Sequence, residues 1–422
     1  MTDDAALGPL DSQPAARRRR ILRLSLFLGS IYFVQGLVEP DAGVATKPIL
    51  FLLKDGLSLA AGQAAIFLGV ITVAWNVKPL YGLISDFFPI FGYRRKSYLL
   101  IMTGVAGLSW LLLGLEATYA YTPVLILLTL CGLGIAFSDV LCDAVMVENG
   151  KPLRMTGRLQ AIQWAAINVA SVLAGVAGGW LAETVSYQHT FLIVSGFPLV
   201  SMLVTAIFLD EPRSKFDRQA VRATARAVRS ALASRQLWIA AAFLFLWDFN
   251  PSFDVPLDYY LVDKLGFSKF YLGLLDSFEA GAAILGALIF ARWGPRFRLR
   301  TLLNAAVAIG VVTTLSYWFM FDRWSAAVVT AFSGATAMIA NLATFDLAAR
   351  SCPAKAEGTF FAALMSIANL ASADSTFVGG WLYEWLGLTP LILLSAVTSA
   401  AGWLVIPHLR IDESPAPAEE DD

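Results

Sequence analysis

Twelve ionisable side chains lie inside long apolar stretches of this 422-residue sequence. They are Glu39, Asp41, Lys47, Lys78, Asp139, Asp143, Asp248, Asp254, Asp276, Glu279, Asp346 and Asp374. Ten are acids and two are lysines, so pairing within the group cannot neutralise every charge. Burial favours the protonated form of a carboxyl group. A carboxyl group that gains and loses a proton as its surroundings change is the chemistry that proton coupling requires.

We therefore predict that at least one of these acids exchanges a proton. The candidates are the four acids nearest the middle of their apolar stretches: Asp276, Glu279, Glu39 and Asp41. The alternative is that these acids line a water-filled cavity or cap the ends of helices. Each of these acids is a functional candidate by default, because a charge in the middle of a bilayer costs about 2.5–3.5 kcal/mol or more.

The two lysines have different expected roles. Lys78 lies about two turns from the end of its apolar stretch, at a depth similar to that of Asp139 and Asp143, which share one helical face. We predict an ion pair between Lys78 and one of these aspartates, either as a scaffold or as a gate. Lys47 lies near Pro40 and Pro48, which should kink or unwind its helix. It is a candidate for binding a substrate carboxylate, or it extends to the nearby membrane surface.

The elements that carry these residues follow from composition. The chain is 57% hydrophobic and only 15% charged, whereas soluble domains are roughly a quarter charged. Apolar runs of roughly 20 residues are long enough to cross a bilayer as helices. We predict an all-α integral membrane protein with twelve such helices, at about 22–53, 60–86, 97–117, 122–149, 154–182, 189–209, 236–263, 268–291, 300–320, 325–350, 356–385 and 388–408.

The positions of the cations predict the orientation of the chain. With a cytoplasmic N-terminus, the cations that fall at outer helix ends are Lys54, Lys264, Lys269 and Arg323. All others except Lys47 and Lys78 fall on the cytoplasmic side, beginning with Arg17–Arg20. This is the positive-inside bias. We predict a multi-pass protein of the plasma membrane with both termini cytoplasmic. In a bacterium this membrane is the inner membrane.

The sequence contains a weak internal repeat. Gly178-Gly179-Trp180-Leu181-Ala182-Glu183 matches Gly379-Gly380-Trp381-Leu382-Tyr383-Glu384 at an offset of 201 residues, and further identities share that register. A repeat of this size indicates a duplicated six-helix unit. We predict two pseudo-symmetric six-helix bundles of the major facilitator type, with a substrate site between them. The expected division is a basic N-terminal segment (1–21), a first bundle (22–209), a linker (210–235), a second bundle (236–408) and a disordered acidic tail (409–422).

The linker carries Arg218, Arg222, Arg226 and Arg229 at helical spacing. It is either a basic amphipathic helix on the anionic inner leaflet or a solvated connection whose arginines enforce the topology.

The sequence lacks the motifs of several catalytic classes. It has no Walker A sequence, no GxSxG elbow, no HExxH motif and only two histidines. We therefore predict no enzyme activity, no catalytic residue, no metal site and no cofactor. Any net transport must then be driven by an ion gradient or by the gradient of the solute itself.

The connection after the second predicted helix has an unusual composition. Gly82 and Asp86 are followed by Pro89, Gly92 and the cluster Arg94-Arg95-Lys96. Gly82 allows close approach of a neighbouring helix, and Asp86 can pair with the cations or cap the next helix. We predict an ion pair or gate among Asp86, Arg94 and Arg95. The cluster could latch the two bundles on the inside, or it could serve topology alone.

The stretch KPLYGLISDFFPIFGYRRKSY (Lys78–Tyr98) resembles the folate–biopterin transporter family of the major facilitator superfamily. Three further stretches strengthen the resemblance: Tyr32-Phe33-Val34-Gln35-Gly36, Ser138-Asp139-Val140-Leu141-Cys142-Asp143-Ala144, and Cys352-Pro353 with Glu357-Gly358-Thr359 and the segment Phe361–Asn369. The resemblance implies a secondary carrier that takes up folates or pterins by alternating access, often with protons.

A pterin presents two adjacent N–H donors, which one carboxylate can accept as a pair. The glutamate tail of a folate would favour a lysine, and aromatic rings could stack on the pteridine. With the resemblance, these requirements give ten candidate substrate-binding residues: Gln35, Glu39, Asp41, Lys47, Trp75, Gln163, Asp248, Asn250, Asn341 and Asn369.

The expected partners are a small solute of the folate or pterin class, protons and membrane lipid, with no nucleic acid, and we expect a monomer. One alternative keeps the carrier and changes its cargo to a muropeptide, another amphipathic anion or an amino-acid-like solute, since fold alone does not fix cargo. Another is a non-transporting membrane receptor, which would have no need of the many acids in the membrane.

Overall fold

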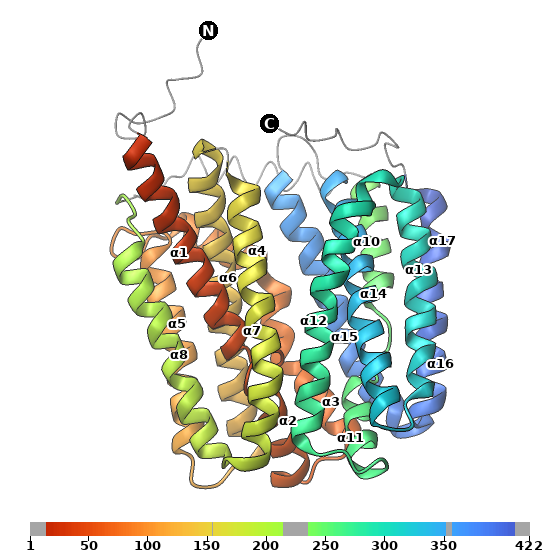
Figure 1. The fold of residues 1–422 in the computed structure, drawn as a ribbon. Helices are drawn as coiled ribbons and strands as arrows, with labels where there is room; N and C mark the ends of the chain where they lie inside the picture. The colour runs from red at the N-terminus through yellow and green to blue at the C-terminus, as the bar shows by residue number, and fades with distance from the viewer. Residues whose placement is uncertain (1–13, 154, 214–234, 352–356, 410–422) are drawn as a thin grey trace. The chain divides into compact units, whose positions relative to one another are not determined.

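The computed structural model describes residues 14–153, 155–213, 235–351 and 357–409, and these residues form helices joined by short connections (Figure 1). Ten of the described helices are long and apolar enough to cross a membrane. A helix satisfies its backbone polar groups internally, which hydrocarbon requires of any spanning segment. The predicted all-α membrane fold is confirmed. The linker arginines and most of the acidic tail lie outside the described residues.

The contacts divide the chain into two compact units. Unit 1 is Met1–Ile49 with Leu80–Arg218, and unit 2 is Leu50–Pro79 with Gln219–Asp422. Residues 50–79, which the sequence analysis places in the first bundle, therefore pack with the second sequence repeat. The proposed division into bundles at 22–209 and 236–408 stays a prediction.

Unit 1 is built from five long helices, of which α5 and α8 lie side by side in Figure 1. They are α1 (Pro14–Val38), α5 (Lys96–Leu115), α6 (Tyr121–Leu153), α7 (Thr156–Thr184) and α8 (Tyr187–Phe208). The helix α1 begins before the expected residue 22 and packs on α7 and α8. Two fully buried rings, Trp110 of α5 and Phe191 of α8, lie with centroids 5.5 Å apart in its core.

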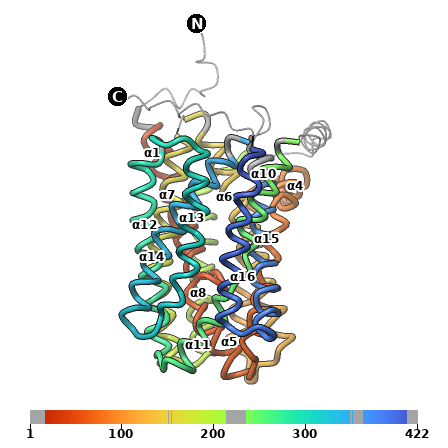
Figure 2. Tube along the Cα trace, turned by 90° about the vertical axis from the view of Figure 1, so that its right-hand side faces the viewer, coloured from red at the N-terminus to blue at the C-terminus, as the bar shows by residue number. Residues whose placement is uncertain are grey.

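Unit 2 contains most of the second repeat, and its α14 packs against both α12 and α13 (Figure 2). Its main helices are α3 (Ala61–Ile71), α10 (Arg235–Asp248), α11 (Asp254–Asp263), α12 (Lys269–Trp293), α13 (Leu299–Ser316), α14 (Arg323–Arg350), α15 (Glu357–Leu386), α16 (Leu388–Ala400) and α17 (Gly402–Val405). Its short helices are η2 (Leu52–Gly56), η3 (Thr72–Val77), η4 (Gly294–Arg296), η5 (Tyr317–Phe319) and η6 (Ile406–His408). The boundary between the units crosses α2 (Thr46–Phe51) and α4 (Lys78–Phe87).

The first predicted span is interrupted, as the prolines near Lys47 indicate. The α1 helix ends at Val38 and α2 begins only at Thr46. The freed backbone groups find partners inside unit 1. Trp110 Nε1 donates to the Val38 carbonyl at 3.1 Å, and the Val44 N–H donates to the Leu37 carbonyl at 2.9 Å. The expected unwinding at Pro40 is therefore confirmed, and Trp110 is a side chain on which it depends.

The seventh predicted span, 236–263, is also interrupted, and the expectation of a continuous helix there is wrong. The α10 helix ends at Asp248 and α11 begins at Asp254. Pro251 lies in the gap, where its missing N–H and its effect on the preceding residue oppose helix. Ser375 of α15 joins the two sides: its carbonyl accepts from the Ser252 N–H at 3.1 Å, and its hydroxyl donates to the Asn250 carbonyl.

The repeated Gly-Gly-Trp motif explains how these interruptions are held. A Cβ on Gly178 of α7 would lie 2.6 Å from the Val44 carbonyl oxygen. A Cβ on Gly379 of α15, the equivalent residue, would lie 1.9 Å from the Ser252 carbonyl oxygen. Both distances are shorter than real contacts allow, so only glycine fits. Each copy of the motif thus places a bare glycine backbone against the interruption in its own unit.

We expect Gly178→Ala to lower the free energy of unfolding by about 1–3 kcal/mol, because the added methyl group must displace the Val44 backbone. The matched control is Gly157→Ala in the same helix, where an added Cβ has no atom within 4 Å. Thermal unfolding of the purified protein in detergent measures both. Equal transition temperatures for Gly178→Ala and Gly157→Ala would contradict the steric argument.

Candidate functional site

A hydrogen-bonded polar cluster lies among the apolar helices of unit 1. Tyr32 Oη donates to Asp143 Oδ1 at 2.6 Å, and Gln163 Nε2 lies 3.4 Å from the same oxygen. Gln35 Nε2 donates to Asp139 Oδ1 at 3.1 Å. The carboxylates come from α6, the tyrosine and one amide from α1, and the other amide from α7. Their i, i+4 spacing on α6 places both aspartates on one face, as the sequence predicts.

The cluster extends from a buried end to an accessible end. Asp139 is 6% exposed and Gln163 is 1% exposed, whereas Asp143 is exposed. A buried carboxylate is tolerated when N–H or O–H donors replace its water, and hydrogen bonds to a charged acceptor are stronger than neutral ones. The arrangement can hold negative charge at Asp139 and present a second carboxylate, oriented by a phenol, at Asp143.

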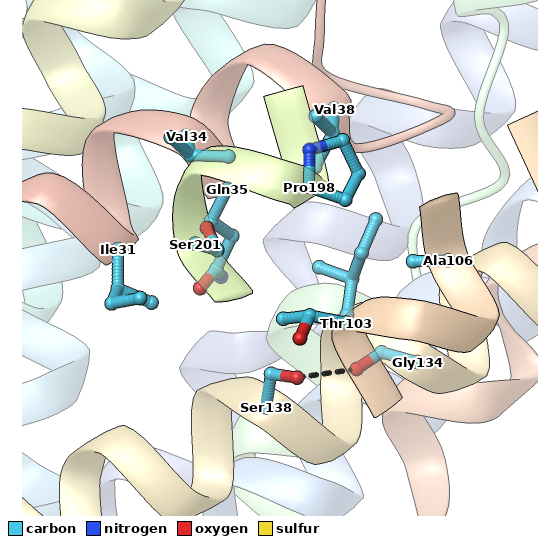
Figure 3. A pocket seen from close by; sticks show the side chains of 11 residues that line it. Ile31, Val34, Gln35, Val38, Thr103, Ala106, Gly134, Ser138, Pro198 and Ser201 are labelled. Atoms are coloured by element: carbon cyan, nitrogen blue, oxygen red, sulfur yellow. Dashed lines mark hydrogen bonds between the residues drawn. The ribbon is translucent and has the colours of Figure 1, made fainter. Parts of the chain in front are cut away.

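A small apolar pocket adjoins this cluster through Gln35 (Figure 3). Its lining comes from α1, α5, α6 and α8, and consists of Ile31, Val34, Gln35, Val38, Thr103, Ala106, Gly134, Ile135, Ser138, Pro198 and Ser201. The Ser138 hydroxyl donates to the Gly134 carbonyl at 2.8 Å, so it is satisfied within its own helix. The chemistry of the pocket suits an apolar group beside the polar cluster.

A second group of predicted residues lies in unit 2, where the second predicted span loses its regular helix. The predicted span at 60–86 is present as Ala61–Phe87, and residues Thr72–Val77 within it form a 3₁₀ segment. Pro79 is the cause, because it has no N–H to donate to the Trp75 carbonyl four residues earlier and its ring crowds that carbonyl. Asn369 Nδ2 of α15 donates to the Trp75 carbonyl instead, at 3.3 Å.

Lys78 lies beside this segment, with its Nζ 4.2 Å from the centroid of the Trp75 ring. An ammonium over an indole face is an attractive cation–π contact. The ion pair of Lys78 with Asp139 or Asp143 stays a prediction. Trp75 and Asn369, both predicted to bind substrate, are brought together here by the hydrogen bond from the Asn369 side-chain amide to the Trp75 backbone carbonyl.

The other predicted residues are distributed over several elements. Glu39 and Asp41 lie in the interruption after α1, half-buried and exposed respectively, and Lys47 is buried in α2. Asp248 is the last residue of α10, and the Asn250 side-chain oxygen accepts from the Ser395 hydroxyl. Asn341 in α14 and both Asp276 and Glu279 in α12 are half-buried. Within the part of the chain that the structure describes, no group of three or more His, Cys, Asp or Glu side chains could hold a metal ion.

The connection from α4 to α5 is a tight turn. Ile90 and Tyr93 exchange backbone hydrogen bonds of 3.1 and 2.9 Å, and the two residues between them have positive φ, +53° at Phe91 and +83° at Gly92. Two central residues of positive φ define the type I′ turn, which favours glycine. The turn reverses the direction of the chain within four residues, and Arg94 and Arg95 therefore lie next to the end of α4.

Arg95 connects this turn to α4 and α6. Its guanidinium contacts the Asp86 carboxylate, donates to Glu148 Oε1 at 2.8 Å and to Ser85 Oγ at 2.5 Å. Burial of the guanidinium disfavours its charge, but the carboxylates of Asp86 and Glu148 outweigh that effect and raise the pKa of Arg95. The predicted pairing of Asp86 with Arg95 is present. These contacts lie within unit 1, and the role of a latch between bundles stays a prediction.

Glu211, just after α8, caps the N-terminus of α5. Its carboxylate accepts from the backbone N–H groups of Arg94 at 2.8 Å, Arg95 at 3.0 Å and Lys96 at 2.8 Å. The Lys96 ammonium in turn donates to the Ala206 and Leu209 carbonyls at the end of α8, both at 2.9 Å. An acid at a helix N-terminus and a cation at a C-terminus both oppose the helix dipole favourably.

Reasoning from the sequence missed one residue of the polar cluster, Tyr32, and three residues around the α4–α5 turn: Ser85, Glu148 and Glu211. Glu148 carried a usable signal, because it follows Asp143 by five residues at the C-terminal end of the same predicted helix. Glu211 carried none, since a lone acid after a helix can cap any of several neighbouring helix ends.

Comparison with known proteins adds a family to this geometry. The sequence profile described as the BT1 family matches residues 42–407. The "Folate-biopterin transporter" of Synechocystis sp. is 30% identical, over 93% of this chain and 84% of its own length. "Folate transporter 1" of Plasmodium falciparum is 26% identical, over 81% of this chain and 70% of its own length.

Solved structures give the fold. A D-xylose–proton symporter superposes with a TM-score of 0.69 at 13% sequence identity, covering 93% of this chain and 98% of its own. The nucleoside transporter NupG gives the same TM-score at 10% identity, covering 92% of this chain and 98% of its own. At such identities the likeness concerns the fold alone, and it is the major facilitator fold that the sequence predicts.

We expect Glu211→Ala to lower the free energy of unfolding by about 1–2 kcal/mol, because the α5 N-terminus loses an acceptor and a favourable charge. The control is Glu116→Ala at the other end of α5, which removes an acid from a helix C-terminus and should be neutral or slightly stabilising. Thermal unfolding decides, and a loss of equal size in both variants would argue against capping by Glu211.

A double-mutant cycle tests the hinge in the second span. Asn369→Ala leaves the Trp75 carbonyl without its donor and should cost about 1 kcal/mol of stability. In a Pro79→Ala background the new N–H can reach that carbonyl, so the cost of Asn369→Ala should shrink. Thermal unfolding of the four proteins measures the coupling. Identical costs in both backgrounds would refute the compensation between Pro79 and Asn369.

Proposed function

Because the chain belongs to the BT1 family, we propose that it is a secondary carrier that takes up a folate or a related pterin by alternating access, driven by protons. The names of its relatives support the solute class. The major facilitator fold supports alternating access between two bundles. We assign the chain no catalytic activity.

The polar cluster of unit 1 is the observation that carries this proposal. The pyrimidine edge of a pterin presents two adjacent N–H donors, and one carboxylate accepts both in a paired, charge-assisted contact. Asp143 is the exposed carboxylate of the cluster, and the phenol of Tyr32 fixes one of its oxygens at 2.6 Å. We propose Asp143 as the acceptor of this edge, with Gln35 and Gln163 completing the polar lining.

The remaining assignments belong to the same proposal. Lys47 is buried at 6% exposure and is a candidate for the carboxylates of a folate tail. Glu39, Asp41, Asp276 and Glu279 are the candidates for proton exchange. The proposed setting is the bacterial inner membrane, with a monomeric carrier whose termini are cytoplasmic.

Uptake into proteoliposomes tests the proposal. We expect labelled folate or labelled biopterin to accumulate when an inward proton gradient is imposed, and only to equilibrate without it. Asp143→Asn should reduce initial uptake at least tenfold, because the NH₂ group of asparagine is a donor and cannot accept the second N–H of the pterin edge. The quantity measured is solute retained by protein-containing vesicles above protein-free vesicles.

Asp322→Asn is the matched control, because Asp322 caps α14 outside the spans and asparagine caps equally well. It should transport like the parent protein. Accumulation that ignores the proton gradient would overturn proton coupling. A well-reconstituted protein that takes up neither solute would overturn the solute class, and full activity of Asp143→Asn would remove that residue from the site.

A further inference from the structure

Two segments of unit 2 hold each other through reciprocal lysine–aspartate pairs. Lys54 Nζ lies 2.6 Å from Asp263 Oδ1 and 2.8 Å from Asp263 Oδ2. Lys269 Nζ lies 2.7 Å from Asp55 Oδ2. The residues of one segment, 54 and 55, follow α2 in the first sequence repeat. The residues of the other segment end α11 and begin α12 in the second repeat.

Each lysine also lies against an aromatic ring of the opposite segment. Lys54 Nζ is 4.6 Å from the Tyr259 ring centroid, and Lys269 Nζ is 4.2 Å from the Phe51 ring centroid. In both segments the ring precedes the aspartate by four residues, one helical turn. Each segment thus contains a ring and a carboxylate that together bind a lysine. The lysine of each segment is bound by the ring and carboxylate of the other segment. We call these four charged residues and two rings the reciprocal lysine pairs.

The backbone around the reciprocal lysine pairs is specialised. Residues Leu52–Gly56 form a π-helical turn, a rare conformation that is frequent at functional sites. This turn carries the adjacent residues Lys54 and Asp55, which have opposite charge and different partners. The Tyr259 hydroxyl also donates to the Leu59 carbonyl at 3.0 Å.

Glycine packing continues the contact along the helices behind the pairs. A Cβ on Gly62 of α3 would lie 2.5 Å from the Gly380 carbonyl oxygen of α15. Figure 1 shows α3 and α11 at the same end of unit 2. Residues 50–62 therefore lie flush against the second repeat at this end.

The pairs are partly exposed to water. The side chains are 16% exposed for Lys54, 51% for Asp263, 30% for Lys269 and 46% for Asp55. Ion pairs in this range are weak and are screened by salt. Lysines are also disfavoured at outer helix ends by the positive-inside bias, yet two of the few outer lysines are used here. A permanent joint between the repeats would be better built from buried apolar side chains, whereas weak polar pairs can separate and re-form.

We propose that the reciprocal lysine pairs are a lock that closes the outer end of the solute pathway and separates each time the carrier opens outward. This inference rests on the proposed function as an alternating-access carrier. Residues 50–62 must leave α11, α12 and α15 for that end to open, and breaking either pair should make this easier. Two equal pairs also give a graded lock, in which loss of one pair leaves the other in place.

Hydrogen–deuterium exchange of the purified protein in nanodiscs tests the lock without any solute. The variants are Lys54→Gln, Asp263→Asn and a charge-swapped double variant that combines Lys54→Asp with Asp263→Lys. We expect each single variant to raise the exchange rate of backbone amides in residues 50–62 and 255–272 by about 1.5- to 5-fold, the range that corresponds to losing one partly exposed pair. The charge-swapped double variant should return these rates toward those of the parent.

Lys264→Gln is the matched control, because it removes the same charge one residue from Asp263 and its side chain is exposed. It should leave both segments unchanged. Unchanged exchange in Lys54→Gln and Asp263→Asn would overturn the lock, as would an increase of equal size in Lys264→Gln. The lock would also be overturned if the charge-swapped double variant, eluting as a monodisperse protein, did not lower the amide exchange rates below those of the single variants.

Uptake measurements separate this inference from the proposed function. If folates and pterins are not transported but the exchange rates respond as expected, the lock stands and the solute class falls. If transport proceeds as proposed but the exchange rates are insensitive, the carrier stands and the lock falls. High salt gives an independent check, because about 1 M salt should raise exchange of the two segments in the parent and much less in Lys54→Gln.

Discussion

Backbone polar groups that leave a helix inside hydrocarbon must find partners within the protein, and this constraint organises the molecule. Among the described residues, three departures from regular helix have a side-chain donor for the freed carbonyl. Trp110 serves the Val38 carbonyl, Ser375 serves the Asn250 carbonyl, and Asn369 serves the Trp75 carbonyl. Without these side chains each freed carbonyl would carry a desolvation penalty of about 1–3 kcal/mol.

The departures matter because of where they place other side chains. Tyr32 and Gln35 lie in the last two turns of α1, just before its interruption, and both reach the aspartates of α6. The 3₁₀ segment carries Trp75 beside Lys78. Interrupted helices are where membrane carriers place their binding groups, since unwound backbone is tolerated there only when it is buried in protein or lines a cavity.

The charges of the chain are used in three different ways. In unit 1, the buried Asp139 and the exposed Asp143 accept hydrogen bonds from the neutral side chains of Gln35 and Tyr32. At the α4–α5 turn, charge is matched within one unit by Arg95, Glu148 and Glu211 with short, multiple contacts. The carboxylates of the reciprocal lysine pairs are more exposed to water than those of the turn. Interaction strength therefore falls from the turn, which holds one unit together, to the pairs, which the proposed cycle must break.

The sequence by itself determined the helical membrane fold, because runs of apolar residues and the placement of cations depend only on the bilayer. It also located the interruption near Pro40, the pairing of Asp86 with Arg95, and the shared face of Asp139 and Asp143, since these follow from local geometry. Only the tertiary structure decided that Tyr32 donates to Asp143, that Glu211 caps α5 from more than a hundred residues away, and that residues 50–79 pack with the second repeat. Such contacts depend on how helices cross, and helical periodicity specifies which face of a helix is polar but not which helix will lie against it.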